Sequence, residues 1–383
     1  MVPAVALRHV AVAFAAACTS SFLLTDCNPS LAWYDKLLRV TANTSNNNSN
    51  NSSISNNSYH DFIDKRVWIV GASSGIGREM AIQLAQSGAQ HLILSSRSTS
   101  SLEAVAATCR RDNPKCRVQV LPLDVTNLQE LISAVAAVQD ATLDIVVLNA
   151  GIGQLSPALE TDPETANSIL QTTALWPMLM TPLLFQSATS AVNNGNQRHL
   201  PHLVVTSSIA GKLAVPLSAV YAAAKFALQG YFWSLQAERP DLRIDLLCPG
   251  PVDTAFHQND KGPCATTTND TTDDTRGLPL ALPPSSKLKM PVQRCVSLML
   301  SAMQRPTARG SEVWIAQQPT LTALYIQQWF PGLQRLIMQA VGPKRVQLWR
   351  EGLDLYDPAS WKRRNASAVV AVESKTATKQ SDD

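Results

Sequence analysis

The feature that most constrains the fold is a regular alternation of short apolar runs and longer amphipathic segments, which begins near residue 65. Six runs are rich in aliphatic residues: RVWIV (66–70), HLILSSR (91–97), RVQVLPLDVT (117–126), LDIVVLNAG (143–151), HLVVTSS (202–208) and LRIDLLCPG (242–250). Between them lie segments such as REMAIQLAQSGA (78–89), whose apolar residues recur at helical spacing. Near-continuous apolar strands joined by helices indicate a parallel sheet covered on both faces. We therefore predict a doubly wound α/β domain, whose ligands sit at the carboxyl ends of the strands.

Composition excludes several classes of function. The chain has 383 residues, enough for one large or two ordinary domains. Its formal net charge is +3, and no segment is dense enough in Lys and Arg to predict a nucleic-acid surface. The seven cysteines are scattered and form no CxxC pair, so the sequence predicts neither a zinc site nor a disulfide framework. We expect no nucleic-acid partner and no bound metal.

The first 62 residues differ in composition from the rest of the chain. Residues 1–30 hold Arg8 and His9 and then a mostly apolar stretch of about fifteen residues, which is typical of a signal peptide or a membrane anchor. A buried N-terminal helix is the alternative. Residues 31–62 are rich in Asn and Ser and predict a disordered linker. From these features we expect the protein to enter the secretory pathway and to be associated with the membrane of the endoplasmic reticulum.

The segments after the sixth run also have distinct compositions. We assign residues 63–318 to the α/β domain, with a flexible Pro- and Thr-rich insert at 257–289. Residues 319–358 are rich in Leu, Trp and Tyr and predict an amphipathic helical extension. This extension fits a membrane surface, and it fits equally well against the domain or a homodimer partner. Residues 359–383 predict a disordered tail.

A glycine loop comes directly after the first apolar run. Gly71, Gly75 and Gly77 stand in GASSGIG with the spacing GxxxGxG, between a predicted strand and a predicted helix. Glycine there permits a tight turn and lets the backbone approach a pyrophosphate at the helix N-terminus. A glycine loop alone is weak, and its alternative is an ordinary turn. Its position favours dinucleotide binding.

A Tyr and a Lys share one face of a later helix. Tyr221 and Lys225 in YAAAK are four residues apart and are therefore neighbours on a helix. A surface pair at the border of an amphipathic helix is the plain alternative. A free phenol has a pKa near about 10, and a cation one turn away favours its ionised form. The pair can therefore act in proton transfer.

Five motifs in this order resemble the short-chain dehydrogenase/reductase family: GASSGIGREMA, LNAG, VVTSSIAGK, YAAAK and PGPVDT. The similarity is close over residues 65 to 258 and looser to 358, and the Ser208–Tyr221 separation of 13 residues is the family's. The resemblance implies a Rossmann-type fold and hydride transfer between a nicotinamide and a carbonyl or alcohol. It makes Tyr221 the acid/base, Lys225 the residue that acidifies it and binds the nicotinamide ribose, and Ser208 the residue that polarises the substrate oxygen. Ser207 is the rival to Ser208.

The resemblance also implies a set of cofactor contacts. The expected cofactor-binding residues are Gly71, Ser73, Ser74, Gly75, Ile76, Gly77, Ser96, Arg97, Asp124, Val125, Asn149, Ala150, Gly151, Tyr221, Lys225, Pro249, Gly250, Val252 and Thr254. Within this set, Asp124 and Val125 are expected at the adenine and Thr254 at the carboxamide. Asn149 is expected to brace the sheet as well as to touch the adenosine ribose. The insert at 257–289 corresponds to the substrate lid.

One catalytic position departs from the family. An Asn usually supports a water-linked proton relay to the lysine, and its place falls on Thr173 in LQTTALW. A threonine hydroxyl can hold a water, but it lacks the carbonyl acceptor of an amide. Thr173 therefore leaves open a chain that keeps the fold and has lost activity.

The end of the second run selects the cofactor. An acidic residue there usually holds the ribose of NAD, whereas this chain has Ser96 followed by Arg97. A guanidinium pairs with a 2′-phosphate through two parallel hydrogen bonds, so we predict NADP(H). A solvated surface charge is the alternative for Arg97.

Three functions remain open. The favoured one is an NADP(H)-dependent oxidoreductase acting on a lipophilic steroid, retinoid or xenobiotic-like carbonyl or alcohol. The second is an NAD(P)-dependent epimerase or dehydratase on the same fold, against which the GxxxGxG spacing counts. The third is a dinucleotide-binding scaffold or sensor with weak or no catalysis.

Overall fold

A seven-stranded parallel sheet forms the centre of the molecule. The computed structural model describes residues 26–28, 31–36, 38, 62–138, 143–192, 200–254, 256 and 288–362. The strand order is β3-β2-β1-β4-β5-β6-β9, and every neighbouring pair is parallel. The strands are β1 (Arg66–Val70), β2 (His91–Ser95), β3 (Arg117–Val120), β4 (Ile145–Leu148), β5 (His202–Thr206), β6 (Ile244–Pro249) and β9 (Glu312–Ile315). The predicted doubly wound α/β fold is confirmed, and β9 adds one strand to the six predicted.

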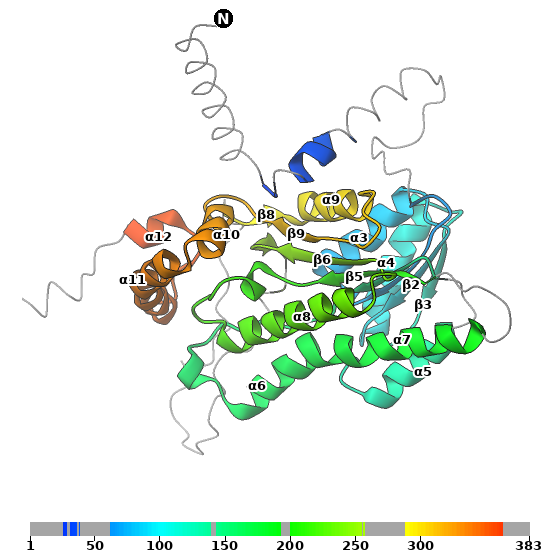
Figure 1. Ribbon diagram of the computed structural model, residues 1–383, viewed down its shortest axis with the longest axis horizontal. Helices are drawn as coiled ribbons and strands as arrows, with labels where there is room; N and C mark the ends of the chain where they lie inside the picture. The colour runs from blue at the N-terminus through cyan, green and yellow to red at the C-terminus, as the bar shows by residue number, and fades with distance from the viewer. Residues whose placement is uncertain are drawn as a thin grey trace, which may run out of the picture.

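Helices cover both faces of the sheet (Figure 1). One face carries α3 (Gly75–Gln86), α4 (Thr99–Asp112) and α9 (Val292–Met303). The other carries α5 (Leu128–Val138), α6 (Pro163–Leu170), α7 (Trp176–Val192) and α8 (Ala219–Glu238). Each face of the sheet packs against its helices to form a hydrophobic core. Strand β1 contributes to both cores, because Val67 and Ile69 pack on the face covered by α3, α4 and α9, while Trp68 and Val70 pack on the opposite face. This alternation is the period of two that a strand imposes on its side chains.

Local signals fix where several helices begin. Ser98 caps α4 by accepting a hydrogen bond from the backbone N–H of Ser101 at 3.3 Å. Asp162 caps α6 in the same way, and Pro163 occupies its first turn. Both arrangements satisfy N–H groups that the start of a helix leaves without partners. Between α6 and α7 lies a π-helical turn, η3 (Gln171–Leu175), so the two helices run on as one.

Several short elements follow the sheet strands, and three helices end the described chain. The 3₁₀ turns η2 (Ala158–Glu160) and η4 (Ile209–Gly211) follow β4 and β5, and β7 (Val252–Asp253) pairs with β8 (Met290–Pro291). After β9 come α10 (Thr320–Trp329), α11 (Pro331–Arg350) and α12 (Pro358–Lys362). Leu348 of α11 packs with Leu217 and Leu355, which holds the extension against the loop before α8. Within the described ranges, no helix combines the length and apolar character that crossing a bilayer requires.

The N-terminal strap, residues 26–28 and 31–36, lies on α9 and β9. Residues 31–36 are helical, although the linker was predicted to begin at 31. Arg294 of α9 pairs with Asp26 at 2.7 Å and with Asp35 at 2.9 Å, and Leu31 is fully buried. Two ion pairs and a buried leucine tie the strap down, so that boundary of the linker is wrong. Residues 1–25, 39–61, 257–287 and 363–383, which hold most of the predicted signal or anchor, linker, lid and tail, lie outside the described residues.

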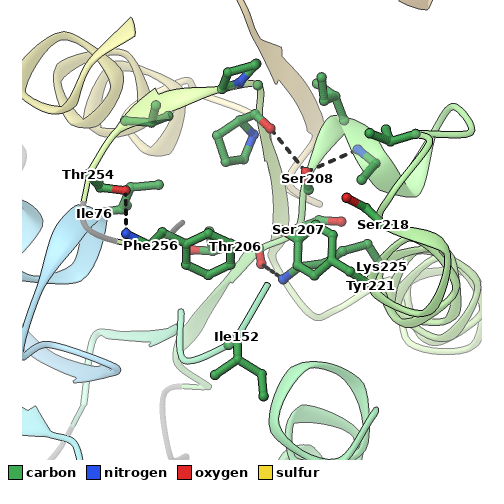
Figure 2. Close-up of a pocket in the computed structure, with 18 of the residues that line it drawn as sticks. Ile76, Ile152, Thr206, Ser207, Ser208, Ser218, Tyr221, Lys225, Thr254 and Phe256 are labelled. Carbon is green, nitrogen blue, oxygen red and sulfur yellow. Dashed lines mark hydrogen bonds between the residues drawn. The ribbon is translucent and has the colours of Figure 1, made fainter. Parts of the chain in front are cut away.

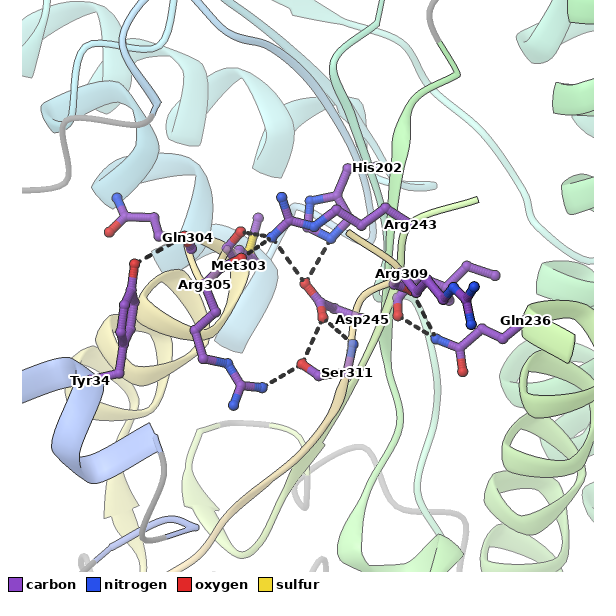
Figure 3. Close-up of polar contacts among 11 residues, drawn as sticks. Tyr34, His202, Gln236, Arg243, Asp245, Met303, Gln304, Arg305, Arg309 and Ser311 are labelled. Carbon is purple, nitrogen blue, oxygen red and sulfur yellow. Dashed lines mark hydrogen bonds and ion pairs between the residues drawn. The ribbon is translucent and has the colours of Figure 1, made fainter. Parts of the chain in front are cut away.

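A buried polar network stabilises the amino ends of β5, β6 and β9 (Figure 3). Asp245 accepts hydrogen bonds from the backbone N–H and the hydroxyl of Ser311 at 2.7 and 2.9 Å. His202 Nε2 lies 2.7 Å from the same carboxylate. Burial lowers the pKa of His202, so the neutral ring donates its Nε2–H to Asp245, which can only accept. Because these residues lie at the amino ends of the strands, the network is far along each strand from the carboxyl ends, where ligands of a doubly wound sheet bind.

Candidate active site

One cavity of about 1250 Å³ lies at the carboxyl ends of the strands, where a doubly wound sheet binds its ligands. It collects residues that follow β1, β2, β4, β5 and β6. The predicted residues that line it are Gly71, Ser73, Ser74, Gly75, Ile76, Ser96, Arg97, Val125, Asn149, Ala150, Gly151, Ser208, Tyr221, Lys225, Pro249, Gly250, Val252 and Thr254. Gly77, Asp124 and Thr173 do not line it.

The glycine loop is built by close backbone approach. Gly71 has φ +96°, and a Cβ on it would lie 2.5 Å from the backbone nitrogen of Ala150. A Cβ on Gly77 would lie 2.0 Å from the carbonyl oxygen of Gly71. Asn149 donates from Nδ2 to that same oxygen at 2.9 Å. The amide of Asn149 therefore braces the ends of β1 and β4, and Gly77 acts by packing rather than by reaching the cavity.

The N-terminus of α3 is suited to an anion. Its N-cap residue, Ser74, makes no side-chain capping bond, and the first turn contains no acidic residue. Ser73, Ser74, Gly75 and Ile76 all line the cavity there. Thr254 closes the loop from the other side, with its Cβ 3.6 Å from where a Cβ on Gly75 would be. Free N–H groups and the positive end of the helix dipole favour a phosphate at this point.

The rim beyond β2 carries a cation and an uncommitted hydroxyl. Arg97 is exposed and makes no ion pair with any described residue. The buried Oγ of Ser96 has no hydrogen-bond partner in the described part of the chain. Asp124 was expected at the adenine, but its carboxylate accepts from the backbone N–H and hydroxyl of Thr126 at 2.9 and 2.8 Å and lies outside the cavity. One oxygen of this carboxylate is thus used within the turn, and Val125 lines the cavity.

Tyr221 and Lys225 lie at the other end of the cavity, on α8 (Figure 2). The Nζ atom of Lys225 lies 5.7 Å from the centre of the Tyr221 ring and donates to the carbonyl oxygen of Thr206 at 2.9 Å. Burial lowers the pKa of Lys225 to about 8. The Tyr221 ring is half-buried and meets Phe256, with ring centres 5.9 Å apart. A phenol and an amine thus share one wall, as their spacing of four predicts.

Ser208 presents its hydroxyl at the same end. Its Oγ accepts from the N–H of Ala210 at 3.1 Å and lies 3.4 Å from the carbonyl oxygen of Pro249. The Oγ of the rival, Ser207, accepts from Gln229 at 3.2 Å on the buried side. The two hydroxyls therefore differ in their surroundings, and both line the cavity.

Thr173 supports the cavity from behind. It is fully buried in the π-helical turn η3. Its hydroxyl donates to the carbonyl oxygen of Ile152 at 3.0 Å and accepts from the N–H of Ile152 at 3.1 Å. One hydroxyl therefore serves as donor and acceptor to the same backbone unit. Ile152 lines the cavity, and Gly151 before it lies beside the Nζ of Lys225.

Sequence reasoning missed one wall of the cavity. Helix α11 contributes Gln334, Ile337, Met338, Val341 and Arg345, and Tyr356 comes from the segment before α12. The only sequence signal was their recurrence at helical spacing within an amphipathic stretch. That spacing does not say whether a helix faces a membrane, a partner or a cavity.

Among the described residues no group of three His, Cys, Asp or Glu could hold a metal ion.

Comparison with known sequences agrees with this geometry. Residues 65–263 match the family model described as short chain dehydrogenase. Dehydrogenase/reductase SDR family member 7 of Homo sapiens is 32% identical over 302 residues, which cover 77% of this chain and 82% of that protein. Estradiol 17-beta-dehydrogenase 1 of Rattus norvegicus is 29% identical over 201 residues, covering 51% of this chain and 56% of that protein.

Solved structures share the fold. A short chain dehydrogenase from Burkholderia cenocepacia in complex with NADP superimposes with a TM-score of 0.55 at 21% identity, covering 73% of this chain and 98% of that chain. A short chain dehydrogenase/reductase from Burkholderia phymatum in complex with NAD gives 0.57 at 21% identity, covering 71% and 96%. At these identities the likeness concerns the fold, and it extends over nearly the whole of each neighbour.

Proposed function

The chain belongs to the short-chain dehydrogenase/reductase family, and from that premise we propose that it is an NADP(H)-dependent oxidoreductase. Its substrate in this proposal is a carbonyl or secondary alcohol of a lipophilic small molecule. The observation that carries the proposal is the shared cavity, in which the phenol of Tyr221, the buried amine of Lys225 and the hydroxyl of Ser208 meet at one end. The anion-binding start of α3 lies in the same cavity.

The proposed mechanism assigns each side chain one task. The cofactor, when bound, supplies the hydride chemistry at the substrate carbon. Tyr221 donates or accepts the proton at the substrate oxygen, as a general acid or base. The ammonium form of Lys225 stabilises the phenolate by its charge and is placed to bind the nicotinamide ribose. Ser208 donates a hydrogen bond to the substrate oxygen and stabilises the charge that develops there.

The residues that would hold the dinucleotide fit a phosphorylated ribose. Among the described residues, no acidic neighbour pairs with Arg97, and the Oγ of Ser96 has no hydrogen-bond partner. A guanidinium and a hydroxyl favour a 2′-phosphate, whereas NAD binding normally uses a carboxylate at this place. The family's solved members include complexes with NADP and with NAD, so the choice of NADP(H) rests on these two side chains.

The cavity lining supports a lipophilic substrate. Leu213, Phe256, Ile337, Met338 and Val341 all line the cavity. Two similar proteins carry the names estradiol 17-beta-dehydrogenase 1 and retinol dehydrogenase 8. Apolar walls with a few polar groups are typical of sites for such molecules. A scaffold without catalysis and an epimerase or dehydratase remain the competing functions.

The outer face of the C-terminal helices supports membrane association. Trp329 and Phe330, at the junction of α10 and α11, are 71% and 64% exposed, and Leu333 and Leu336 on α11 are also exposed. Aromatic and aliphatic side chains gathered on one helix face favour the boundary layer of a lipid bilayer. We propose that this face, with the N-terminal segment, associates the enzyme with the endoplasmic reticulum. A homodimer through the same face is the alternative, and vesicle flotation of a Trp329→Ser/Phe330→Ser double variant, with its oligomeric state measured alongside, separates the two.

Turnover with a substrate panel tests the enzymatic proposal. Purified protein is mixed with NADPH and with ketones, quinones and aldehydes, and NADPH absorbance is monitored. We expect Tyr221→Phe to lower kcat by about 100-fold or more, because general acid catalysis contributes that much. The matched control is Tyr231→Phe on the same helix, whose hydroxyl donates to the carbonyl oxygen of Met178. Activity retained by Tyr221→Phe, or absent from the wild type on every compound, would refute the proposal.

A further inference from the structure

We propose that the substrate is a lipophilic carboxylic acid, held by its carboxylate at Arg345 while its carbonyl or alcohol group meets Tyr221. This inference rests on the proposed function and narrows its substrate class. It comes from the cavity wall that α11 supplies, and in particular from a cation on that wall whose charge no described side chain neutralises.

One face of α11 lines the cavity in a polar–apolar–polar order. Gln334 and Arg345 are the outer members, and Ile337, Met338 and Val341 lie between them. Positions 334, 337, 338, 341 and 345 share one face because they repeat at three and four residues. At 1.5 Å per residue the two outer positions are roughly 16 Å apart. A ligand lying along this face meets an apolar centre and a polar group at each end.

Arg345 is a cation that no carboxylate of the described residues neutralises. Its Nε atom is buried without a hydrogen-bond partner in that part of the chain, and its guanidinium carbon lies 5.4 Å from the centre of the Tyr356 ring. The next arginine on the helix, Arg350, pairs with Glu160 at 2.7 Å. A guanidinium with a buried, unpaired N–H is costly, and a ligand carboxylate would relieve that cost through two parallel hydrogen bonds.

Two acidic residues of the segment between α11 and α12 make hydrogen bonds within its turn. Asp354 accepts from the backbone N–H of Tyr356 at 2.9 Å. Asp357 accepts from the N–H of Ala359 at 3.0 Å. These two carboxylates shape the turn that precedes α12, and neither forms an ion pair with Arg345 in the described part of the chain. The turn therefore holds Tyr356 against the cavity while leaving the cation available.

A second cation lies against the same aromatic ring. Lys289 is 9% exposed, and its Nζ lies 5.2 Å from the centre of the Tyr356 ring. It makes no ion pair with any described residue. Two positive groups around one ring repel each other unless an anion joins them. Because both cations lie against Tyr356, which lines the cavity, we place the carboxylate of the substrate at this end of the cavity.

The opposite end of the face is polar but neutral. Gln334 is 3% exposed, and its Oε1 atom has no hydrogen-bond partner among the residues that the structure describes. Arg97, a further cation of the cavity, follows β2, whereas Arg345 belongs to α11, which follows β9 in the chain. Arg97 is the group proposed for the cofactor, so Arg345 is left for the substrate.

A catalytic experiment tests the acid preference. The probes are ω-oxo acids with chains of about 6 to about 14 carbons and their methyl esters. Their lengths are on the order of the roughly 16 Å of the α11 face and sample the span from Arg345 to Tyr221. We expect the wild type to reduce the best acid with a kcat/KM about 10 to 100 times that of its ester, the range of a charge-assisted pair. Arg345→Gln removes this ratio, and Arg345→Lys restores part of it. Arg350→Gln, on the same helix, leaves the ratio unchanged.

A binding experiment separates this inference from the proposed function. Calorimetry measures decanoate and decanamide binding to the protein with NADP⁺, which requires no turnover. We expect decanoate to bind about 10 to 100 times more tightly than decanamide to the wild type, and equally to Arg345→Gln. If no carbonyl is reduced but this preference is found, the function fails and the acid site stands. If carbonyls are reduced but acid and neutral probes behave alike in both proteins, the acid site is wrong and the function stands.

Discussion

Replacing Thr173 by valine tests how the cavity floor is held. Valine has nearly the shape of threonine but lacks the hydroxyl, which donates to the carbonyl oxygen of Ile152 at 3.0 Å and accepts from its N–H at 3.1 Å. Thr173 is fully buried, and valine offers neither a donor nor an acceptor in place of its hydroxyl. Both backbone groups of Ile152 would then lack a partner. Serine at this position keeps the hydroxyl and is the matched control.

The expected magnitude depends on those two groups. Each buried unsatisfied group costs about 1–3 kcal/mol, so Thr173→Val should lower the free energy of unfolding by about 2–5 kcal/mol. For a domain of this size, each kcal/mol shifts the midpoint by about 2–4 °C, which predicts a fall of roughly 4–20 °C. Thr173→Ser loses one methyl group, and its expected cost is about 1 kcal/mol.

Thermal unfolding monitored by circular dichroism measures the difference between the two variants. NADPH turnover is measured alongside, because Gly151, which precedes Ile152, lies beside the Nζ of Lys225. We expect kcat to fall more in Thr173→Val than in Thr173→Ser. Equal midpoints for the valine and serine variants would refute the reasoning, since they differ in the hydroxyl that carries it.

Three further predictions concern the cofactor, the buried lysine and the network beneath the sheet. Arg97→Ala should raise the Kd of NADPH about 10-fold or more and leave that of NADH nearly unchanged, since only NADPH carries the 2′-phosphate; equal losses in a fluorescence titration would remove the cofactor assignment. Burial lowers the pKa of Lys225 from 10.5 to about 8, so between these pH values the folded protein binds fewer protons than the unfolded chain and its stability rises with pH. That rise is about 3 kcal/mol in denaturant titrations and should be missing from Lys225→Met; identical pH profiles would contradict it. Asp245→Ala leaves His202 and the N–H of Ser311 without their buried acceptor and should cost about 3–5 kcal/mol of stability. Its KM for NADPH should stay that of the wild type, and a changed KM would show that the network reaches the active site.

The sequence predicted the sheet well because its strands carry local signals. Five of the six predicted runs form strands that are buried almost throughout, and the sixth forms the edge strand β3, whose Arg117 is exposed. Strand β9 (EVWI) was not among the predicted runs. Its place beside β6 is set by pairing across the sheet, which a single run does not reveal.

The site was predictable where motifs are local and unpredictable where distant segments meet. The glycine loop and the Tyr221–Lys225 pair have fixed spacings, and both line the cavity. Asp124 does not line the cavity, and its Oδ1 accepts from Thr126 in its own turn. The wall formed by α11 depends on how a helix more than 100 residues after Tyr221 folds back over the sheet edge. Neither spacing nor composition encodes that path.

Helix α11 borders two different environments, and its sequence must satisfy both. Exposed Leu333 and Leu336 lie on the outside, while Met338, Val341 and Arg345 line the cavity. Among related enzymes, the inner register should therefore drift with the shape and charge of the metabolite, and the outer register with the surface on which the enzyme resides. Exchanging only the cavity-lining residues of α11 between two such enzymes should change the substrate and leave the membrane association as it was. Exchanging only the outer residues should have the opposite effect.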